Sequence, residues 1–154
     1  MGRAAAMTMD SVRARAGRQI AVSEWIAIDQ ERIDRFAHAT DDAQWIHLDI
    51  GRAERESPYG ATVAHGFLTL SMLSHCSREV LAIEGTRMRV NYGLNRVRFP
   101  AAVRAGSFIR ARFDLCGVKD FEGGADLTLA VTVDLQGSEK PCCVAEWIVR
   151  YYWI

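Results

Sequence analysis

Long apolar runs, net charge and paired cysteines are missing from this sequence, and each absence removes a class of protein. No stretch reaches the roughly 18 apolar residues that span a bilayer, and the opening MGRAAAMTMDSVRARAG lacks the apolar segment of a signal peptide. Lys and Arg total 19, as do Asp and Glu, so the basic surface typical of nucleic-acid-binding proteins is absent. We therefore expect a cytoplasmic protein without membrane or nucleic-acid partners.

The cysteines form no C-x-x-C pair. They are Cys76, Cys116, Cys142 and Cys143. This spacing favours neither a disulfide framework nor a zinc knuckle, so reduced and mostly buried thiols are expected. A chain of 154 residues can bury a hydrophobic core without such crosslinks.

The chain is expected to form one domain behind a short extension. Residues 1–20 carry clustered arginines and are interpreted as an N-terminal extension that is partly mobile. Residues 21–154 are interpreted as a single domain.

Two helices are expected in the first half of the domain. Residues 29–40 begin with Asp29, whose carboxylate can cap free backbone N–H groups, and an apolar stripe follows from Ile33. Residues 66–85 carry apolar side chains on nearly all sides, which indicates a helix surrounded by protein. Gly85 is expected to end this second helix.

Four extended segments of often alternating polarity follow the second helix. They cover residues 87–99, 107–118, 125–135 and 142–154. Their short connections predict an antiparallel meander. Since a largely apolar helix precedes the sheet, we predict an α+β hot-dog fold, in which a curved antiparallel sheet wraps around a long central helix. The sheet edges left open by this fold favour a homodimer.

His65 and Gly66 stand at the expected N-terminus of the central helix. Free backbone N–H groups and the positive end of the helix dipole suit an oxyanion or a polarised substrate carbonyl there. Gly66 would allow a ligand to approach the backbone closely. Alternatively, His65 caps the helix and Gly66 only relieves crowding.

Asp42 and His47 are five residues apart in the segment TDDAQWIHLD, across an expected turn. In such a bend both side chains can converge on one water molecule, where one group accepts a proton while the other donates one. Structural uses of such a pair are common, so this spacing leaves a structural role open. A zinc site made of Asp42, His47 and His65 matches no metal-binding signature, and we expect no metal.

Four separated motifs, in this order, resemble those of the MaoC-like dehydratases. These are hot-dog proteins that include the (R)-specific enoyl-CoA hydratases and the nodulation-protein-N-like members. The motifs are T-D-D-A-Q-W-I-H-L-D, S-P-Y-G-A-T-V-A-H-G-F-L-T-L-S, N-Y-G-L-N-R-V-R-F-P and C-V-A-E-W-I-V-R-Y-Y. The resemblance extends from about Ala21 to Tyr152, nearly the whole chain.

The resemblance implies an (R)-specific enoyl-CoA hydratase, or 3-hydroxyacyl-thioester dehydratase, which is a hydro-lyase that adds water syn to a trans-2-enoyl thioester. Asp42 and His47 match the catalytic pair of the family's D-x-N-P-x-H motif. Gly66 matches the glycine whose N–H holds the thioester carbonyl oxygen. The resemblance implies no cofactor, because coenzyme A or an acyl carrier enters as part of the thioester substrate.

Three residues depart from the family motif. Asp41 stands in place of glycine, Gln44 in place of asparagine and Trp45 in place of proline. Gln44 can make the same amide hydrogen bonds and is expected to orient the site. Asp41 adds a second carboxylate, which would disfavour ionisation of Asp42. Two alternatives therefore stay open: a hot-dog acyl-CoA thioesterase and a non-catalytic acyl-CoA-binding homologue.

Overall fold

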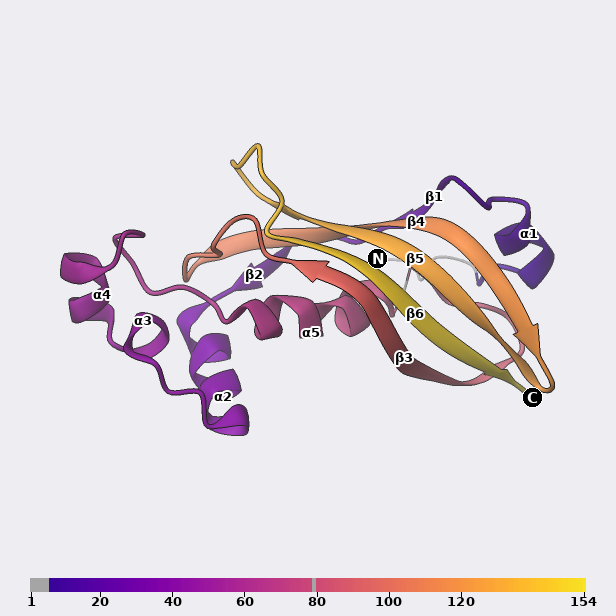
Figure 1. Cartoon of the computed structure of the whole chain (residues 1–154), viewed down its shortest axis with the longest axis horizontal. Coiled ribbons are helices and arrows are strands. Elements are labelled where there is room, and N and C mark those ends of the chain that lie inside the picture. The colour runs from indigo at the N-terminus through magenta and orange to yellow at the C-terminus, as the bar shows by residue number, and fades with distance from the viewer. Residues whose placement is uncertain (1–5, 79) are drawn as a thin grey trace.

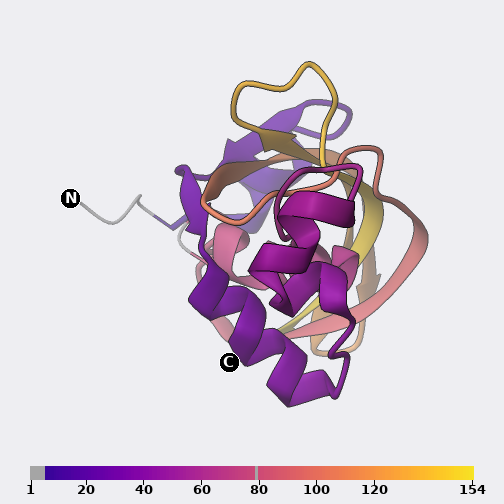
Figure 2. The ribbon, with the colours of Figure 1, turned by 90° about the vertical axis from the view of Figure 1, so that its left-hand side faces the viewer.

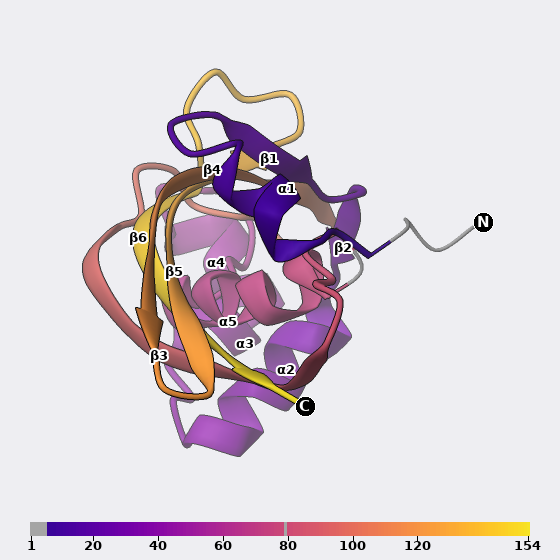
Figure 3. The ribbon, with the colours of Figure 1, turned by 90° about the vertical axis from the view of Figure 1, so that its right-hand side faces the viewer.

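One curved antiparallel sheet lies over the helix α5 (Gly66–Ser77) in the computed structural model, which describes residues 6–78 and 80–154. The strands are β1 (Gln19–Val22), β2 (Ile26–Ile28), β3 (Thr86–Arg98), β4 (Ser107–Phe121), β5 (Gly124–Leu135) and β6 (Cys143–Trp153). In Figure 1 helix α5 runs along the concave side of the sheet, and in Figure 3 the sheet curves around it. The predicted hot-dog fold is confirmed.

The hydrophobic core fills the space between this sheet and α5. Along β5 the buried side chains of Leu127, Leu129, Val131 and Val133 alternate with less buried ones, as the sequence pattern predicted. They belong to the same buried cluster as Leu73 of α5.

The order of the strands differs from the predicted meander at β3. Strands β4, β5 and β6 do form a meander, but β3 pairs with β6 instead of β4. The other side of β4 pairs with β1 and β2. These strands have four and three residues and are too short to show a clear alternation of polarity in the sequence. Residues 99–106 therefore cross from one side of the sheet to the other instead of forming a hairpin.

Helix α5 is shorter and less enclosed than predicted. It ends at Ser77, whereas Gly85 lies in the turn before β3 with a φ of 71°. Phe67 is 69% exposed, so one side of the helix is uncovered in the single chain.

Residues 6–20 pack onto the domain. Helix α1 (Met9–Arg13) contributes Val12, which is fully buried in the core, and Met7 forms a parallel bridge with Ile83. The expected boundary at residue 20 therefore does not separate these residues from the domain, because Val12 fills part of its core. Residues 1–5 of the expected extension lie outside the described residues.

Helices α2 (Gln30–Thr40), α3 (Trp45–Leu48) and α4 (Ile50–Glu56) gather at one end of α5 (Figures 1 and 2). The predicted cap of α2 is confirmed, because the Asp29 carboxylate accepts a hydrogen bond of 2.8 Å from the Arg32 N–H. None of the helices in the described residues is long and apolar enough to cross a membrane.

The cysteines also follow the prediction. All four are free thiols, with Cys116 exposed and the other three buried.

Helix α2 ends at Thr40, and the next residue, Asp41, has a left-handed backbone with a φ of 57°. A side chain is strained in this conformation, which glycine adopts freely and which Asn and Asp tolerate better than other residues. The glycine of the family motif is therefore explained by the backbone at this position, and Asp41 is a tolerated replacement.

We predict that Asp41→Gly leaves the free energy of unfolding unchanged or raises it by up to about 1 kcal/mol, whereas Asp41→Val lowers it by about 1–2 kcal/mol. Urea denaturation of each variant measures the difference. Asp41→Asn is the matched control, because it removes the charge and keeps the tolerance of positive φ. A Val variant as stable as the wild type would contradict the backbone explanation.

Candidate active site

A cavity of about 340 Å³ lies at the N-terminal end of α5. This volume is within the range of small-molecule sites, roughly 300–1,000 Å³. The lining comes from α3, from the segments on both sides of residue 65, and from the crossing segment after β3. Its residues are Ile46, His47, Tyr59, Val63, Ala64, Gly66, Thr69, Phe99, Pro100, Ala101, Ala102, Val103 and Cys142.

His47 is fixed at both its ring and its backbone. Its Nδ1 lies 2.6 Å from the carbonyl oxygen of Val63, and because a carbonyl only accepts, Nδ1 carries the proton and donates it. The His47 N–H donates to the Gln44 carbonyl at 3.0 Å, and the His47 carbonyl accepts from Nε2 of Gln30 at 2.8 Å. In the neutral ring Nε2 is therefore the nitrogen that can accept a proton.

Burial lowers the pKa of His47 below its ordinary value. The hydrogen bond to Val63 raises this pKa, the neighbouring His65 lowers it, and the Asp42 carboxylate raises it, but burial has the largest effect. His47 is therefore neutral near pH 7, which is the state that a general base requires.

His65 packs against two rings and bonds to the backbone of Asp42. It is 2% exposed, and its ring stacks on His47 with centroids 3.7 Å apart and planes inclined by 24°. The ring also packs against Phe36 of α2 at 5.0 Å. Its Nε2 donates to the Asp42 carbonyl at 2.9 Å. The His65 side chain makes no capping hydrogen bond to α5, so the helix-cap alternative is wrong.

Asp42 and His47 lie within reach of one water molecule. A carboxylate oxygen of Asp42 and a ring nitrogen from each of His47 and His65 all lie within 4.8 Å of one another. A water that makes two hydrogen bonds of about 2.8 Å joins groups up to roughly 5 Å apart. The Asp42 side chain is 52% exposed, so solvent reaches the pair. The fold thus brings together the two residues that the sequence selected.

These three side chains are close enough for a metal ion, but their orientation does not suit one. The lone pairs of a histidine lie in the plane of its ring, and because the planes of these stacked rings are nearly parallel, the two lone pairs converge poorly on one tetrahedral ion. One nitrogen of each ring is also hydrogen-bonded to a carbonyl, of Val63 for His47 and of Asp42 for His65. The geometry favours acid–base chemistry.

The start of α5 supplies hydrogen-bond donors to the cavity. Gly66 is the first helical residue, so its N–H has no acceptor within the helix, and the N-cap residue His65 adds no side-chain cap. The positive end of the helix dipole lies at the same place. This end of α5 therefore suits an oxygen atom that gains negative charge during a reaction.

Phe99 of the crossing segment explains why residue 66 is glycine. A Cβ at this position would lie 2.9 Å from Cδ2 of Phe99, which is too close. Phe99 also meets Phe67 edge to face, with centroids 6.3 Å apart. We predicted that a ligand would approach the backbone of Gly66 closely. In the single chain the ring of Phe99 lies there instead.

Two of the three departures from the family motif, Gln44 and Trp45, fall at the start of α3. Gln44 is the N-cap residue, and its exposed side chain makes no capping bond, whereas Asn is among the residues that cap best. Trp45 is the first helical residue, a position that favours proline, and the Arg52 guanidinium lies 4.3 Å from the centre of its ring. In the described residues the side chain of Gln44 makes no hydrogen bond, and its role at the site stays a prediction.

Gln30 makes the amide contacts that were expected of Gln44. Its Nε2 donates to the His47 carbonyl and to the Asp34 carboxylate, both at 2.8 Å, and its Oε1 accepts from the Thr62 hydroxyl. Thr62 precedes Val63, the residue that holds the His47 ring. Sequence reasoning missed Gln30, because a polar residue in the first turn of a helix ordinarily faces solvent and only the fold brings it to His47.

Comparisons with known proteins identify the family of the chain. The family model for the MaoC like domain matches residues 11–136. The chain is 48% identical over 139 residues to the 3-hydroxyacyl-thioester dehydratase Z of Mycobacterium tuberculosis. The alignment covers 90% of this chain and 91% of the relative. It is 44% identical over 145 residues to nodulation protein N of Rhizobium leguminosarum bv. viciae. This alignment covers 92% of this chain and 89% of that relative.

The fold is also that of a solved hydratase. The unliganded R-hydratase PhaJ1 from Pseudomonas aeruginosa superposes with a TM-score of 0.70 at 20% identity, covering 90% of this chain and 83% of that one. The match of the family model over most of the chain, together with the two relatives, establishes the family: the chain belongs to the MaoC-like dehydratases.

Proposed function

We propose that this protein is an (R)-specific enoyl-thioester hydratase, equivalently a 3-hydroxyacyl-thioester dehydratase, of the hydro-lyase class. The observation that carries the proposal is the convergence of Asp42 and His47 within one water's reach, beside the N-terminus of α5. The similar dehydratase and R-hydratase support the reaction class.

The reaction adds water to the double bond of a trans-2-enoyl thioester. Asp42 and His47 hold the water; one of them takes a proton from it as its oxygen attacks the β-carbon, and the pair returns a proton to the α-carbon on the same face. Nε2 of His47 is the nitrogen available for this transfer, because Nδ1 is bonded to Val63. Negative charge that builds on the thioester oxygen is stabilised by the Gly66 N–H and the helix dipole. Dehydration is the same sequence in reverse.

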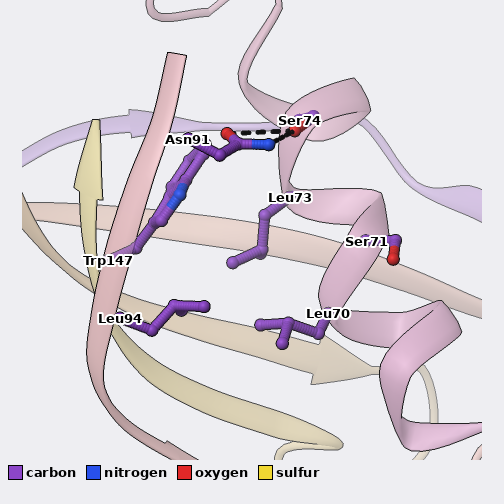
Figure 4. Close-up of a pocket in the computed structure, with 7 residues that line it drawn as sticks. All are labelled: Leu70, Ser71, Leu73, Ser74, Asn91, Leu94 and Trp147. Carbon is purple, nitrogen blue, oxygen red and sulfur yellow. Dashed lines mark hydrogen bonds between the residues drawn. The ribbon is translucent and has the colours of Figure 1, made fainter. Parts of the chain in front are cut away.

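An apolar groove provides room for the acyl chain along the same face of α5. Gly66, Leu70 and Leu73 recur at helical spacing and so share one side of the helix. In Figure 4, Leu70 and Leu73 point toward Leu94 of β3 and Trp147 of β6 across a groove of about 190 Å³. The groove begins one helical turn beyond Gly66, and we propose that it receives the acyl chain of a bound thioester.

The far end of this groove is closed by a polar contact. Nδ2 of Asn91 on β3 donates to the Ser74 hydroxyl at 3.0 Å (Figure 4). Eight residues of α5 separate Gly66 from Ser74, a rise of about 12 Å, which limits the length of acyl chain that lies fully inside.

The site favours hydration over the two alternatives. A thioesterase would direct water at the carbonyl carbon, whereas Asp42 and His47 form the acid–base pair that addition to a double bond requires. A non-catalytic acyl-CoA-binding protein would need no neutral histidine fixed in one tautomer. The left-handed backbone accounts for the residue type at position 41, and the activity of Asp41→Asn tests the effect of the extra carboxylate.

We also propose that the protein is a homodimer formed through β3. This 13-residue strand is at the edge of the sheet, and its exposed apolar residues are Met88, Val90, Tyr92 and Leu94. An unpaired edge of this length is a site for pairing with another chain, and a two-fold axis would join β3 to β3 of a second copy. The same partner would cover the exposed Phe67 of α5 and close the open side of the groove.

The remaining proposals concern cofactor, carrier and location. The hydration chemistry assigned to Asp42, His47 and Gly66 needs no metal or redox cofactor. Coenzyme A and an acyl carrier protein both present the thioester that the site would bind, and the assay below separates them. A cytoplasmic location stays a prediction made from the sequence.

We expect purified protein to hydrate trans-2-enoyl-CoA. The reaction is measured as the loss of the absorbance of the conjugated thioester. Asp42→Asn and His47→Ala should each lower kcat by about 10²–10⁴-fold, because each removes half of the acid–base pair. Asp41→Asn is the matched control, since it neutralises the neighbouring carboxylate and should retain activity. Crotonyl, octenoyl and hexadecenoyl thioesters of both carriers define the chain length and the carrier.

Equal rates for the wild type and both variants would rule out the proposed mechanism. Release of free thiol from saturated acyl-CoA would indicate a thioesterase instead. Tight acyl-CoA binding with neither reaction would identify a binding protein.

For the dimer, light scattering during size-exclusion chromatography should give twice the chain mass of 17.2 kDa. Tyr92→Lys, which places a charge on the exposed edge strand, should shift the protein to the monomer. Phe108→Lys alters an equally apolar exposed residue on β4 and should leave the dimer intact. A wild type that stays monomeric at micromolar to millimolar concentrations would refute this interface.

A further inference from the structure

We propose that His65 is a positioning residue that holds both members of the catalytic pair, Asp42 through its backbone and His47 through its ring. This inference rests on the proposed hydratase function and goes beyond it. His65 does not cap α5, although it is the N-cap residue, so its side chain is available for another role.

The first contact ties down Asp42. Asp42 follows the left-handed Asp41 and lies in an irregular segment before α3, where no helix or strand fixes it. Nε2 of His65 donates to the Asp42 carbonyl at 2.9 Å, while the Asp42 carboxylate lies 4.0 Å from the same nitrogen. The hydrogen bond therefore anchors the backbone and leaves the carboxylate free for a water molecule.

The second contact fixes the plane of the His47 ring. The Val63 carbonyl holds Nδ1 of His47 but would still allow the ring to tilt about that bond. Stacking on His65 at 3.7 Å removes this freedom, and His65 itself is buried against Phe36. The position of Nε2 of His47 thus depends on a ring that never needs to touch the substrate.

The protonation of His65 follows from its bonds. Because the Asp42 carbonyl only accepts, Nε2 of His65 carries a proton. In the neutral ring the other nitrogen, Nδ1, is a bare acceptor, and it is buried without a partner in the described part of the chain. A phenyl ring at this position would remove the unpartnered Nδ1 and keep an aromatic ring against His47, and the Asp42 carbonyl would be the group that loses its donor.

Two variants separate the two contacts. His65→Phe keeps the ring against His47 and removes the donor to Asp42, whereas His65→Gln keeps an N–H at a similar distance from the backbone and removes the ring. We expect His65→Phe to lower kcat about 10–100-fold while KM changes less than about threefold, because misplacement of a catalytic group affects the chemical step. The kcat of His65→Gln should be higher than that of His65→Phe.

Two controls show that the site is otherwise intact. The affinity for butyryl-CoA, a saturated thioester that cannot react, should be the same in both variants, and thermal unfolding should show that they fold. The ¹³C resonance of the Asp42 carbonyl should move in His65→Phe and stay near its wild-type position in His65→Gln.

The outcomes are distinguishable. If the wild type hydrates enoyl-CoA and His65→Phe has the wild-type kcat, this inference is wrong and the proposed function stands. If His65→Gln is no more active than His65→Phe and the Asp42 resonance does not move, the bond to Asp42 has no positioning role. An inactive wild type would overturn the proposed function and this inference with it.

Discussion

The hydrogen bond from Nδ1 of His47 to the Val63 carbonyl is the contact on which the site depends. It selects the tautomer that leaves Nε2 free, and it joins α3 to the segment that leads into α5. Val63 returns a hydrogen bond to the Ile46 carbonyl at 3.0 Å, so the two segments are joined at both backbone and side chain. Because Gly66 follows Val63 by three residues, the same contact sets the distance between the acid–base pair and the free N–H groups of α5.

Much of this arrangement could be predicted from the sequence, because it depends on local patterns. The Asp29 cap, the alternation along β5 and the start of α5 at Gly66 follow from side chains close together in the chain. Asp42 and His47 could be selected because a short turn limits how far apart they can lie, and the resemblance to the MaoC-like dehydratases reinforced that choice. The pairing of β3 with β6 could not be predicted, because it depends on β1 and β2 occupying the far side of β4.

What the sequence left unresolved are contacts between residues distant in the chain. Gln30 reaches the His47 carbonyl only because α2 packs beside α3. Phe99 reaches Gly66 only because the segment after β3 crosses the sheet. Asp41 stood out as a departure from the family motif, and only the fold shows that its backbone is left-handed. In each case the residue type was visible, but its partner was set by the fold.

The central claim is that Asp42 and His47 act together on one water at one face of the substrate. Hydration of crotonyl-CoA in D₂O, with the product analysed by NMR, tests this claim most directly. A single face of attack predicts that deuterium at the α-carbon and the hydroxyl at the β-carbon are added syn. Anti addition, or a mixture of both, would show that the proton and the hydroxyl come from different groups and would contradict the account.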